Sequence, residues 1–204
     1  MDKTIYIVDD DESVISALQN LLSSEGYLVS TFISPAAFLN QTDYCTPCCL
    51  IVDLNMPGLD GFDVSLRLTE RGYSIPTIFL TGYGTIPITV RAMKAGAFEF
   101  LTKPVMPDEL LKVVSEALAL SEKSALVSLE KLALTGRYNS LTPREKELMQ
   151  LISRGLLNKQ VAAEMGISEI TAKVHKRRVI EKMLVRSVSE LVRTAEKLGL
   201  LHDN

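Results

Sequence analysis

Residues 48–54 read CCLIVDL, and this run of apolar side chains ending in a carboxylate decides the fold. A near-continuous apolar run is typical of a strand that helices cover on both faces of a parallel sheet. Comparable runs stand before and after it: TIYIV at 4–8, YLVSTF at 27–32, PTIFLT at 76–81 and FEFL at 98–101. We therefore predict five strands, with residues 48–54 in the middle of the sheet.

Amphipathic stretches separate and follow these runs, which is the order that repeated strand–helix units require. We expect helices at residues 13–24, 34–41, 61–71, 86–94 and 107–120. Pro35 fits the first turn of the second helix, and Gly26 and Gly72 lie just beyond the ends of the first and third. The prediction is an α/β fold at residues 1–120, a flavodoxin-like, doubly wound sheet of five parallel strands.

The rest of the chain predicts helices only. Residues 121–140 form the expected linker, whose loosely spaced leucines favour a partly helical segment that continues the preceding helix; a flexible coil is the alternative. At residues 141–204 we expect a small all-α, four-helix domain of the helix-turn-helix kind. Thr142 with Glu145, and Ser187 with Glu190, have the spacing of capping boxes, and Gly166 ends the second helix.

Charge divides unevenly along the chain. Residues 1–136 carry 9 Lys and Arg against 17 Asp and Glu, whereas residues 137–204 carry 13 against 8. An acidic N-terminal part and a basic C-terminal part indicate two domains with different partners, and the basic domain favours a polyanion. No apolar run approaches the about 20 residues that span a bilayer, and the first residues lack a signal-peptide core, so we expect a cytoplasmic protein without a membrane partner.

The three cysteines, Cys45, Cys48 and Cys49, stand together in CTPCC. An odd count without a secretion signal argues against a disulfide framework. A second Cys/His cluster that would complete a zinc site is missing from the sequence, so we expect free thiols.

Polar side chains mark the expected carboxyl ends of the strands. They are Asp9, Asp10 and Asp11 after the first strand, Asp53 at the third, Thr81 at the fourth and Lys103 after the fifth. Because ligand sites form where parallel strands end, the fold should gather these groups at one edge of the sheet. Any one of these Asp residues is as readily a helix cap or turn residue, so the argument rests on the set.

Such a set suits phosphoryl transfer. Clustered carboxylates need a cation, and an oxygen-rich site with open positions suits Mg²⁺, for which Mn²⁺ could substitute. A carboxylate can act as the nucleophile and form an acyl phosphate, while the metal and a lysine neutralise charge on the phosphoryl oxygens.

The segments IVDDDES, IVDLNMPGLDG, FLTGYG and FLTKP resemble the signatures of response-regulator receiver domains, and AMKAGAFEFLTKP resembles the FixJ-type subgroup. The resemblance implies that Asp53 is the phosphoacceptor and that Thr81 and Lys103 bind the phosphoryl group. It also implies that Asp9, Asp10, Asp53 and the backbone carbonyl of Asn55 hold Mg²⁺. Asp11 is left as a charge at a helix N-terminus.

The same resemblance implies a switch formed by Thr81 and Phe100. If Thr81 moves toward a bound phosphoryl group, Phe100 can rotate into the vacated space and alter the face formed by residues 86–94 and the fifth strand. In the family this face mediates dimerisation. Val90, Arg91 and Lys94 are the candidate contacts here, although a solvated polar face explains them equally well.

The predicted helix that begins at Ser168 is the most basic of the chain, with Lys173, His175, Lys176, Arg177, Arg178 and Lys182. Its apolar residues, Ile170, Val174, Val179 and Met183, are expected to pack in the core, and Val174 is equally placed to contact a base. A basic helix after a Gly-containing turn can enter the major groove of DNA, where Arg and Lys reach bases or phosphates.

LTPRE, GLLNK, the GIS turn, TAKVH and SVSELV resemble the LuxR/FixJ-type helix-turn-helix. By position, the resemblance implies that Lys173, Val174 and Arg177 read bases. Thr171, Lys176, Arg178 and Lys182 are assigned to phosphate contacts or to structure. The helix at residues 187–198 would pair two such domains on a two-fold site in double-stranded DNA.

Together these features predict a transcription factor gated by phosphorylation. A sensor histidine kinase would phosphorylate Asp53, and the chain would then dimerise and regulate transcription, as an activator acting with RNA polymerase. It would catalyse only its own phosphoryl transfer and dephosphorylation and would not be an enzyme for an external substrate. Two alternatives stay open: a phosphatase or phosphotransferase that uses the Asp cluster, and a phosphate-independent scaffold.

Overall fold

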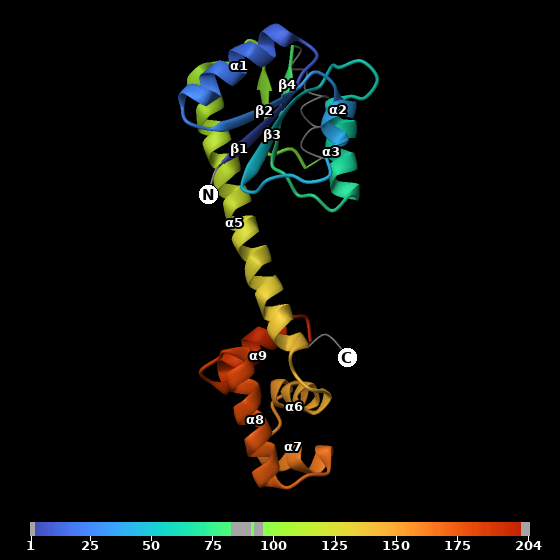
Figure 1. The fold of residues 1–204 in the computed structure, drawn as a ribbon, viewed down its shortest axis with the longest axis vertical. Coiled ribbons are helices and arrows are strands. Elements are labelled where there is room, and N and C mark those ends of the chain that lie inside the picture. Colours follow the sequence, from blue (N-terminus) through green and yellow to red (C-terminus); the bar gives the residue numbers. More distant parts are fainter. Residues whose placement is uncertain (1–2, 83–90, 92–95, 201–204) are drawn as a thin grey trace. The chain divides into compact units, whose positions relative to one another are not determined.

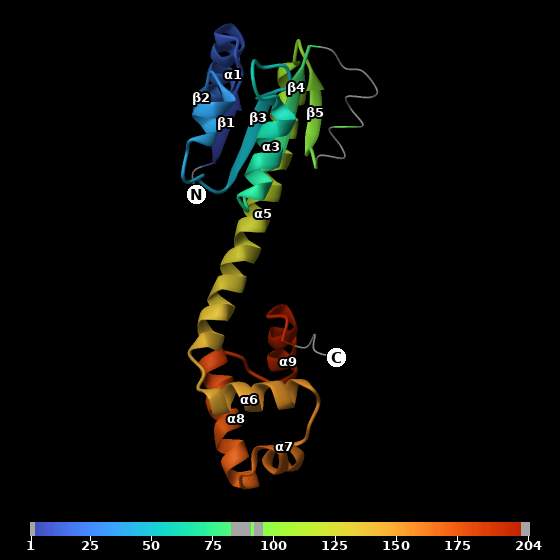
Figure 2. The ribbon, with the colours of Figure 1, turned by 90° about the vertical axis from the view of Figure 1, so that its right-hand side faces the viewer.

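The computed structural model describes residues 3–82, 91 and 96–200. Its five strands are β1 Thr4–Val8, β2 Leu28–Phe32, β3 Cys48–Asp53, β4 Thr77–Thr81 and β5 Glu99–Thr102. All are parallel, in the order β2-β1-β3-β4-β5, which can be followed in Figure 2. The flavodoxin-like sheet predicted from the sequence is confirmed, and β3 occupies its centre.

Helices cover both faces of this sheet. They are α1 Glu12–Ser24, α2 Pro35–Leu39, α3 Gly61–Glu70 and α5 Pro107–Asn139. Figure 1 shows α1 and α5 on one side and α2 and α3 on the other. The helix expected at residues 86–94 lies outside the described residues, apart from Arg91, which is helical.

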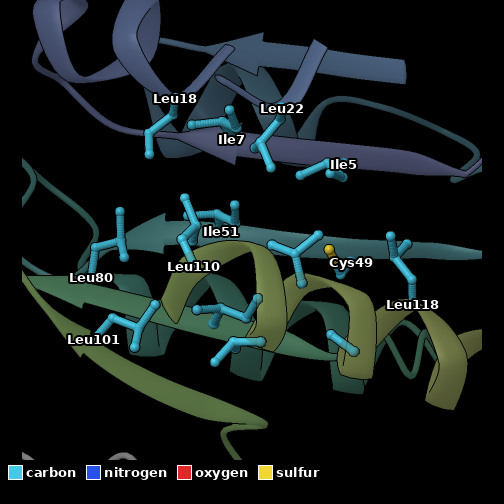
Figure 3. Packing of buried hydrophobic residues seen from close by; sticks show 14 of the residues in the cluster. Ile5, Ile7, Leu18, Leu22, Cys49, Ile51, Leu80, Leu101, Leu110 and Leu118 are labelled. Carbon is cyan, nitrogen blue, oxygen red and sulfur yellow. The ribbon is translucent and has the colours of Figure 1, made fainter. Parts of the chain in front are cut away.

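Strand alternation divides the core into two layers. Ile5 and Ile7 of β1 face α1 and α5, while Tyr6 and Val8 face α2 and α3. Figure 3 shows the first layer, in which Leu18 and Leu22 of α1 and Leu110 and Leu118 of α5 pack on Ile5, Ile7, Cys49 and Ile51. Because both faces are buried, the strands need apolar residues at successive positions, which explains the uninterrupted run in β3.

The predicted linker is part of a single helix. Residues 121–139 continue α5 without a break, so the coil alternative is wrong. The chain divides into two compact units, Met1–Ala125 and Leu126–Asn204. Among the helices that the structure describes, none is both long enough and apolar enough to cross a membrane.

The second unit contains α6 Pro143–Ser153, α7 Asn158–Met165, α8 Glu169–Met183 and α9 Val188–Lys197. Leu148, Val179 and Leu191, from three of these helices, are fully buried in its core. The capping box of Thr142 and Glu145 is formed as predicted. The second box is only half formed, because the Glu190 carboxylate accepts the N–H of Arg186, one residue before the expected partner.

The start of α3 lies unusually close to the end of β3. A Cβ atom on Gly61 would stand 2.6 Å from the backbone oxygen of Asp53. Such an approach is possible only because glycine lacks a side chain. The site at the end of β3 is therefore packed directly against the first turn of α3.

We predict that Gly61→Ala lowers the stability of the first unit by about 1–3 kcal/mol, because backbone must shift to admit the methyl group. Urea denaturation of the full chain measures this. Gly136→Ala is the matched control, since Gly136 is an exposed helical glycine with nothing near its Cβ position. It should be neutral or stabilising by about 0.5–1 kcal/mol, and equal effects of the two changes would contradict the close packing.

Candidate metal centre and nucleic-acid interface

The acidic side chains predicted to meet at the carboxyl edge of the sheet do lie together. Asp9 and Asp10 follow β1, and Asp53 ends β3, the neighbouring strand. One carboxylate oxygen from each of the three lies within 4.8 Å of the others. Asp9 and Asp53 are buried and Asp10 is exposed, so the cluster is reached from solvent on the side of Asp10.

Lys103 supplies the positive charge that the buried carboxylates need. Its Nζ lies 2.6 Å from Oδ2 of Asp9 and 2.9 Å from Oδ1 of Asp53. The backbone N–H of Lys103 donates a hydrogen bond of 2.7 Å to the backbone carbonyl oxygen of Thr81, the buried last residue of β4. The fold thus brings all five predicted pocket residues to one edge of the sheet.

Burial and ion pairing act in opposite directions on the protonation of this pocket. Burial raises the pKa of Asp9, and the hydrogen bond from Lys103 lowers it only in part. Burial alone would lower the pKa of Lys103, but its bonds to Asp9 and Asp53 outweigh that effect and raise the pKa. Lys103 therefore stays a charged ammonium at neutral pH and can pair with an anion.

Backbone groups of the adjoining loops orient the two buried carboxylates. The backbone N–H of Asn55 donates a hydrogen bond to Oδ2 of Asp53, and the backbone N–H of Asp11 donates one to Oδ1 of Asp9. The donor–acceptor distance is 2.9 Å in both. Asp11 also caps α1 by accepting the N–H of Ser13, so its expected place at the helix start is confirmed. The role predicted for the Asn55 carbonyl stays a prediction.

Phe100, the predicted switch residue, stands beside Phe79 in the pairing of β5 with β4. Its side chain is half-buried against the layer that contains α2 and α3. The aromatic ring therefore lies on the face of the sheet that α2 and α3 cover, and its movement between two positions stays a prediction.

Arg91, a predicted dimer contact, is engaged within its own chain. Its Cζ lies 4.4 Å from the ring centre of Phe62, and its Nη2 lies 3.3 Å from Oδ2 of Asp60. Both partners stand at the start of α3. Val90 and Lys94 lie outside the described residues, so the predicted dimer face stays a prediction.

The three cysteines are free, as predicted. Cys45 is exposed, whereas Cys48 and Cys49 begin β3 and are buried. Burial raises the pKa of Cys48 to about 12 and also raises that of Cys49. These two thiols stay protonated at neutral pH and pack as small apolar side chains.

In the second unit, α8 presents one face to solvent and buries the other. The buried face carries Ala172, Val179 and Met183. The exposed residues are Glu169, Ile170, Thr171, Lys173, Val174, Arg177, Arg178, Glu181 and Lys182. The predicted base-reading residues Lys173, Val174 and Arg177 therefore share the free face, with Ser168 capping the helix start.

The prediction that Ile170 packs in the core is wrong. Its side chain is 76% exposed, and that of Val174 is 45% exposed. The step of five residues from Val174 to Val179 turns an α-helix by about 140°, so the pair 170/174 and the pair 179/183 cannot face the same way. Only the second pair meets α6 and α7, and Val174 keeps its alternative assignment to a base contact.

Acidic partners hold several of the basic side chains of α8. Lys173 pairs with Glu169 at 3.2 Å, and Arg177 pairs with Glu181 at 2.8 Å. Both pairs are exposed and span one helical turn, so each stabilises the free helix only slightly. The Lys176 ammonium donates to the side chain of Asn158, at the start of α7.

Comparison with known proteins decides the family. The description "Response regulator receiver domain" matches residues 5–115, and "Bacterial regulatory proteins, luxR family" matches residues 139–195. The chain belongs to the LuxR/FixJ-type response regulators. A receiver domain implies a sensor kinase as its partner, and a LuxR-family domain implies binding to DNA.

Similar proteins share both parts of this response regulator. Response regulator protein TmoT of Ectopseudomonas mendocina is 43% identical over 97% of this chain and 90% of its own. Transcriptional regulatory protein FixJ of Bradyrhizobium diazoefficiens is 37% identical over 98% and 97% of the two chains. The solved structure of response regulator StyR has a TM-score of 0.86 and 42% identity, and covers 97% of this chain and 100% of its own.

Sequence reasoning missed one buried ion pair of the response regulator. Lys182 Nζ lies 2.6 Å from Oε2 of Glu145, whose side chain is almost fully buried. The same carboxylate accepts the N–H of Thr142 in the capping box. Burial alone would raise the pKa of Glu145, but the bonds from Lys182 and Thr142 lower it. The capping spacing revealed Glu145, but its partner is distant in sequence and follows only from the fold.

We predict that Lys182→Met lowers the stability of the second unit by roughly 1–3 kcal/mol at neutral pH, because a buried carboxylate loses its charged partner. Thermal unfolding of the full chain between neutral and acidic pH measures the effect. The folded-state pKa of Glu145 is lowered, so this stability is present above its unfolded pKa and is lost as pH falls through the folded one. The difference between wild type and variant should therefore shrink in acid.

Lys159→Met serves as the control, because Lys159 is an exposed residue of α7. It should leave the unfolding temperature nearly unchanged. A difference between wild type and Lys182→Met that is the same at every pH would contradict the role given to the ion pair.

Proposed function

We propose that a sensor histidine kinase phosphorylates Asp53 of this response regulator in a reaction that depends on Mg²⁺. The phosphorylated chain then dimerises and regulates transcription as an activator. In this assignment residues 1–120 are the receiver, 121–140 the linker and 141–204 the DNA-binding domain. The observation that carries the proposal is the contact of one ammonium group, that of Lys103, with the carboxylates of both Asp9 and Asp53.

The donor set fits a hard divalent cation. Three carboxylate oxygens lie within 4.8 Å of one another, and oxygen ligands with open positions are what Mg²⁺ prefers. Asp9, Asp10 and Asp53 would hold the ion, together with the backbone carbonyl of Asn55. A bound Mg²⁺ would neutralise charge on the transferring phosphoryl group.

The phosphoryl step uses the carboxylate of Asp53 as the nucleophile. One oxygen of that carboxylate attacks the phosphorus of the phosphohistidine, a P–O bond forms, the P–N bond breaks, and its electron pair returns to the histidine ring. Lys103 already touches Asp53 and can transfer a hydrogen bond from the carboxylate to a phosphoryl oxygen. Asp9 keeps the ammonium in place during this exchange. Hydrolysis of the acyl phosphate by water resets the site.

The switch couples this pocket to the dimer face. Phosphorylation adds negative charge and acceptor oxygens next to Lys103, and the hydroxyl of Thr81 turns toward them. Phe100 then rotates inward, and it has no hydroxyl that could form a hydrogen bond at either position. The face of Val90, Arg91 and Lys94 changes with it and pairs with a second copy.

Binding to DNA uses the exposed face of α8. The helix enters the major groove, where Lys173, Val174 and Arg177 meet base edges and Thr171, Lys176 and Arg178 approach phosphates. Lys182 is held by Glu145, so we assign it to the stability of the domain. Helix α9 pairs two domains on a two-fold site, beside which RNA polymerase is recruited.

Asp53→Asn tests the receiver mechanism, because an amide cannot form the acyl phosphate. With acetyl phosphate and Mg²⁺, wild type should dimerise in sedimentation analysis and protect promoter DNA in footprinting, whereas the variant should stay monomeric and protect it no better than without the donor. Asp43→Asn, at an exposed position, is the control and should respond as wild type. Donor-dependent dimerisation of Asp53→Asn would refute the mechanism.

Arg177→Ala tests the DNA face. If Arg177 makes a bidentate contact with guanine, its loss should weaken specific binding by roughly 1–3 kcal/mol. Binding isotherms over a series of salt concentrations measure this, with Arg154→Ala, at the exposed C-cap of α6, as the control. Wild-type affinity of the Arg177 variant at every salt concentration would remove Arg177 from the interface.

A further inference from the structure

The exposed face of α8 carries two apolar side chains that take no part in the core. Ile170 and Val174 are one helical turn apart, and both project from the face opposite Ala172, Val179 and Met183. Residues four apart in a helix lie one above the other, so the two side chains form a continuous apolar strip. This strip lies beside Lys173 and Arg177.

The strip is rigid before anything binds to it. Isoleucine and valine branch at Cβ and have one strongly preferred χ1 rotamer in a helix. Ile170 lies in the first turn of α8. The Ser168 hydroxyl caps this turn by accepting a hydrogen bond of 3.1 Å from the backbone N–H of Thr171. A partner that contacts the strip therefore loses little free energy to the ordering of side chains.

The surrounding charge identifies that partner as DNA. Lys173, Arg177 and Arg178 flank the strip, and such a face is complementary to a polyanion. Two of these cations are already paired with Glu169 and Glu181, so phosphate attraction is partly offset in the free protein. The apolar side chains of Ile170 and Val174 have no such intramolecular partner. Their contacts can therefore contribute to DNA-sequence specificity without first breaking an ion pair.

We propose that Ile170 and Val174 read the 5-methyl groups of thymine in the major groove, which makes Ile170 a specificity-determining residue. The 5-methyl of thymine is the apolar group that base edges present in that groove, and the N-terminal part of a recognition helix is the part that reaches bases. The inference rests on the proposed binding of α8 to DNA and adds the chemistry that selects the site.

The test removes single methyl groups from the DNA. A duplex is first selected from a random library with the full chain, phosphorylated by acetyl phosphate and Mg²⁺. Each thymine of the selected site is then replaced in turn by deoxyuridine, which keeps the hydrogen-bonding edge and lacks the methyl group. Dissociation constants are measured for wild type, Ile170→Ala, Val174→Ala and the double variant.

We expect uracil at one or two thymines of each half-site to weaken wild-type binding about fourfold per methyl group. Ile170→Ala and Val174→Ala should each lose the effect at one position, and the double variant should not distinguish thymine from uracil. Leu157→Ala is the control, because Leu157 is 71% exposed in the same unit but belongs to the N-cap of α7. It should keep the full response, and circular dichroism checks that all variants are folded.

Each other outcome overturns the inference. A selected site whose affinity is indifferent to uracil, or a methyl effect that survives in the double variant, rejects the reading of thymine while binding to DNA stands. Unchanged binding to DNA in the double variant would assign the strip to a protein partner instead. Failure to select any duplex rejects the proposed function together with the inference.

Discussion

Lys103 sets the charge balance of the receiver. Burying the carboxylates of Asp9 and Asp53 would be costly without an opposite charge, and the single ammonium between them meets that need for both. Parallel strands make the arrangement possible, because β1, β3 and β5 all end at the same edge of the sheet. The ammonium that stabilises the resting pocket is also the group that the proposed phosphoryl transfer uses, so in that proposal binding of the anion requires these two ion pairs to rearrange.

The pocket is joined to the surface of the receiver through the start of α3. Gly61 lets the helix touch the backbone of Asp53, and the next residue on each side, Asp60 and Phe62, holds the guanidinium of Arg91. Close packing at Gly61 and the contacts of Asp60 and Phe62 with Arg91 thus connect the end of β3 with a surface residue.

The pocket was predictable from sequence because strand ends converge in a parallel sheet, so residues 9, 53, 81 and 103 needed only their strands to be recognised. The helix α5 was predictable in part, from the spacing of its leucines. Partners from distant elements were not: nothing near Glu145 or Lys182 in the sequence indicates their contact. Ile170 was misassigned because two apolar pairs with the same spacing occur in α8, and only contacts with α6 and α7 decide which is buried.

The acidic neighbours of Lys173 and Arg177 have a consequence for how the protein finds its site. Glu169 and Glu181 lie beside these two cations and offset part of the positive charge that α8 presents to DNA. Fewer dissolved ions are then released when α8 meets an arbitrary sequence, and it is this release that drives adhesion to random DNA. The regulator should therefore dissociate quickly from non-target sequences and sample a chromosome through many short binding events.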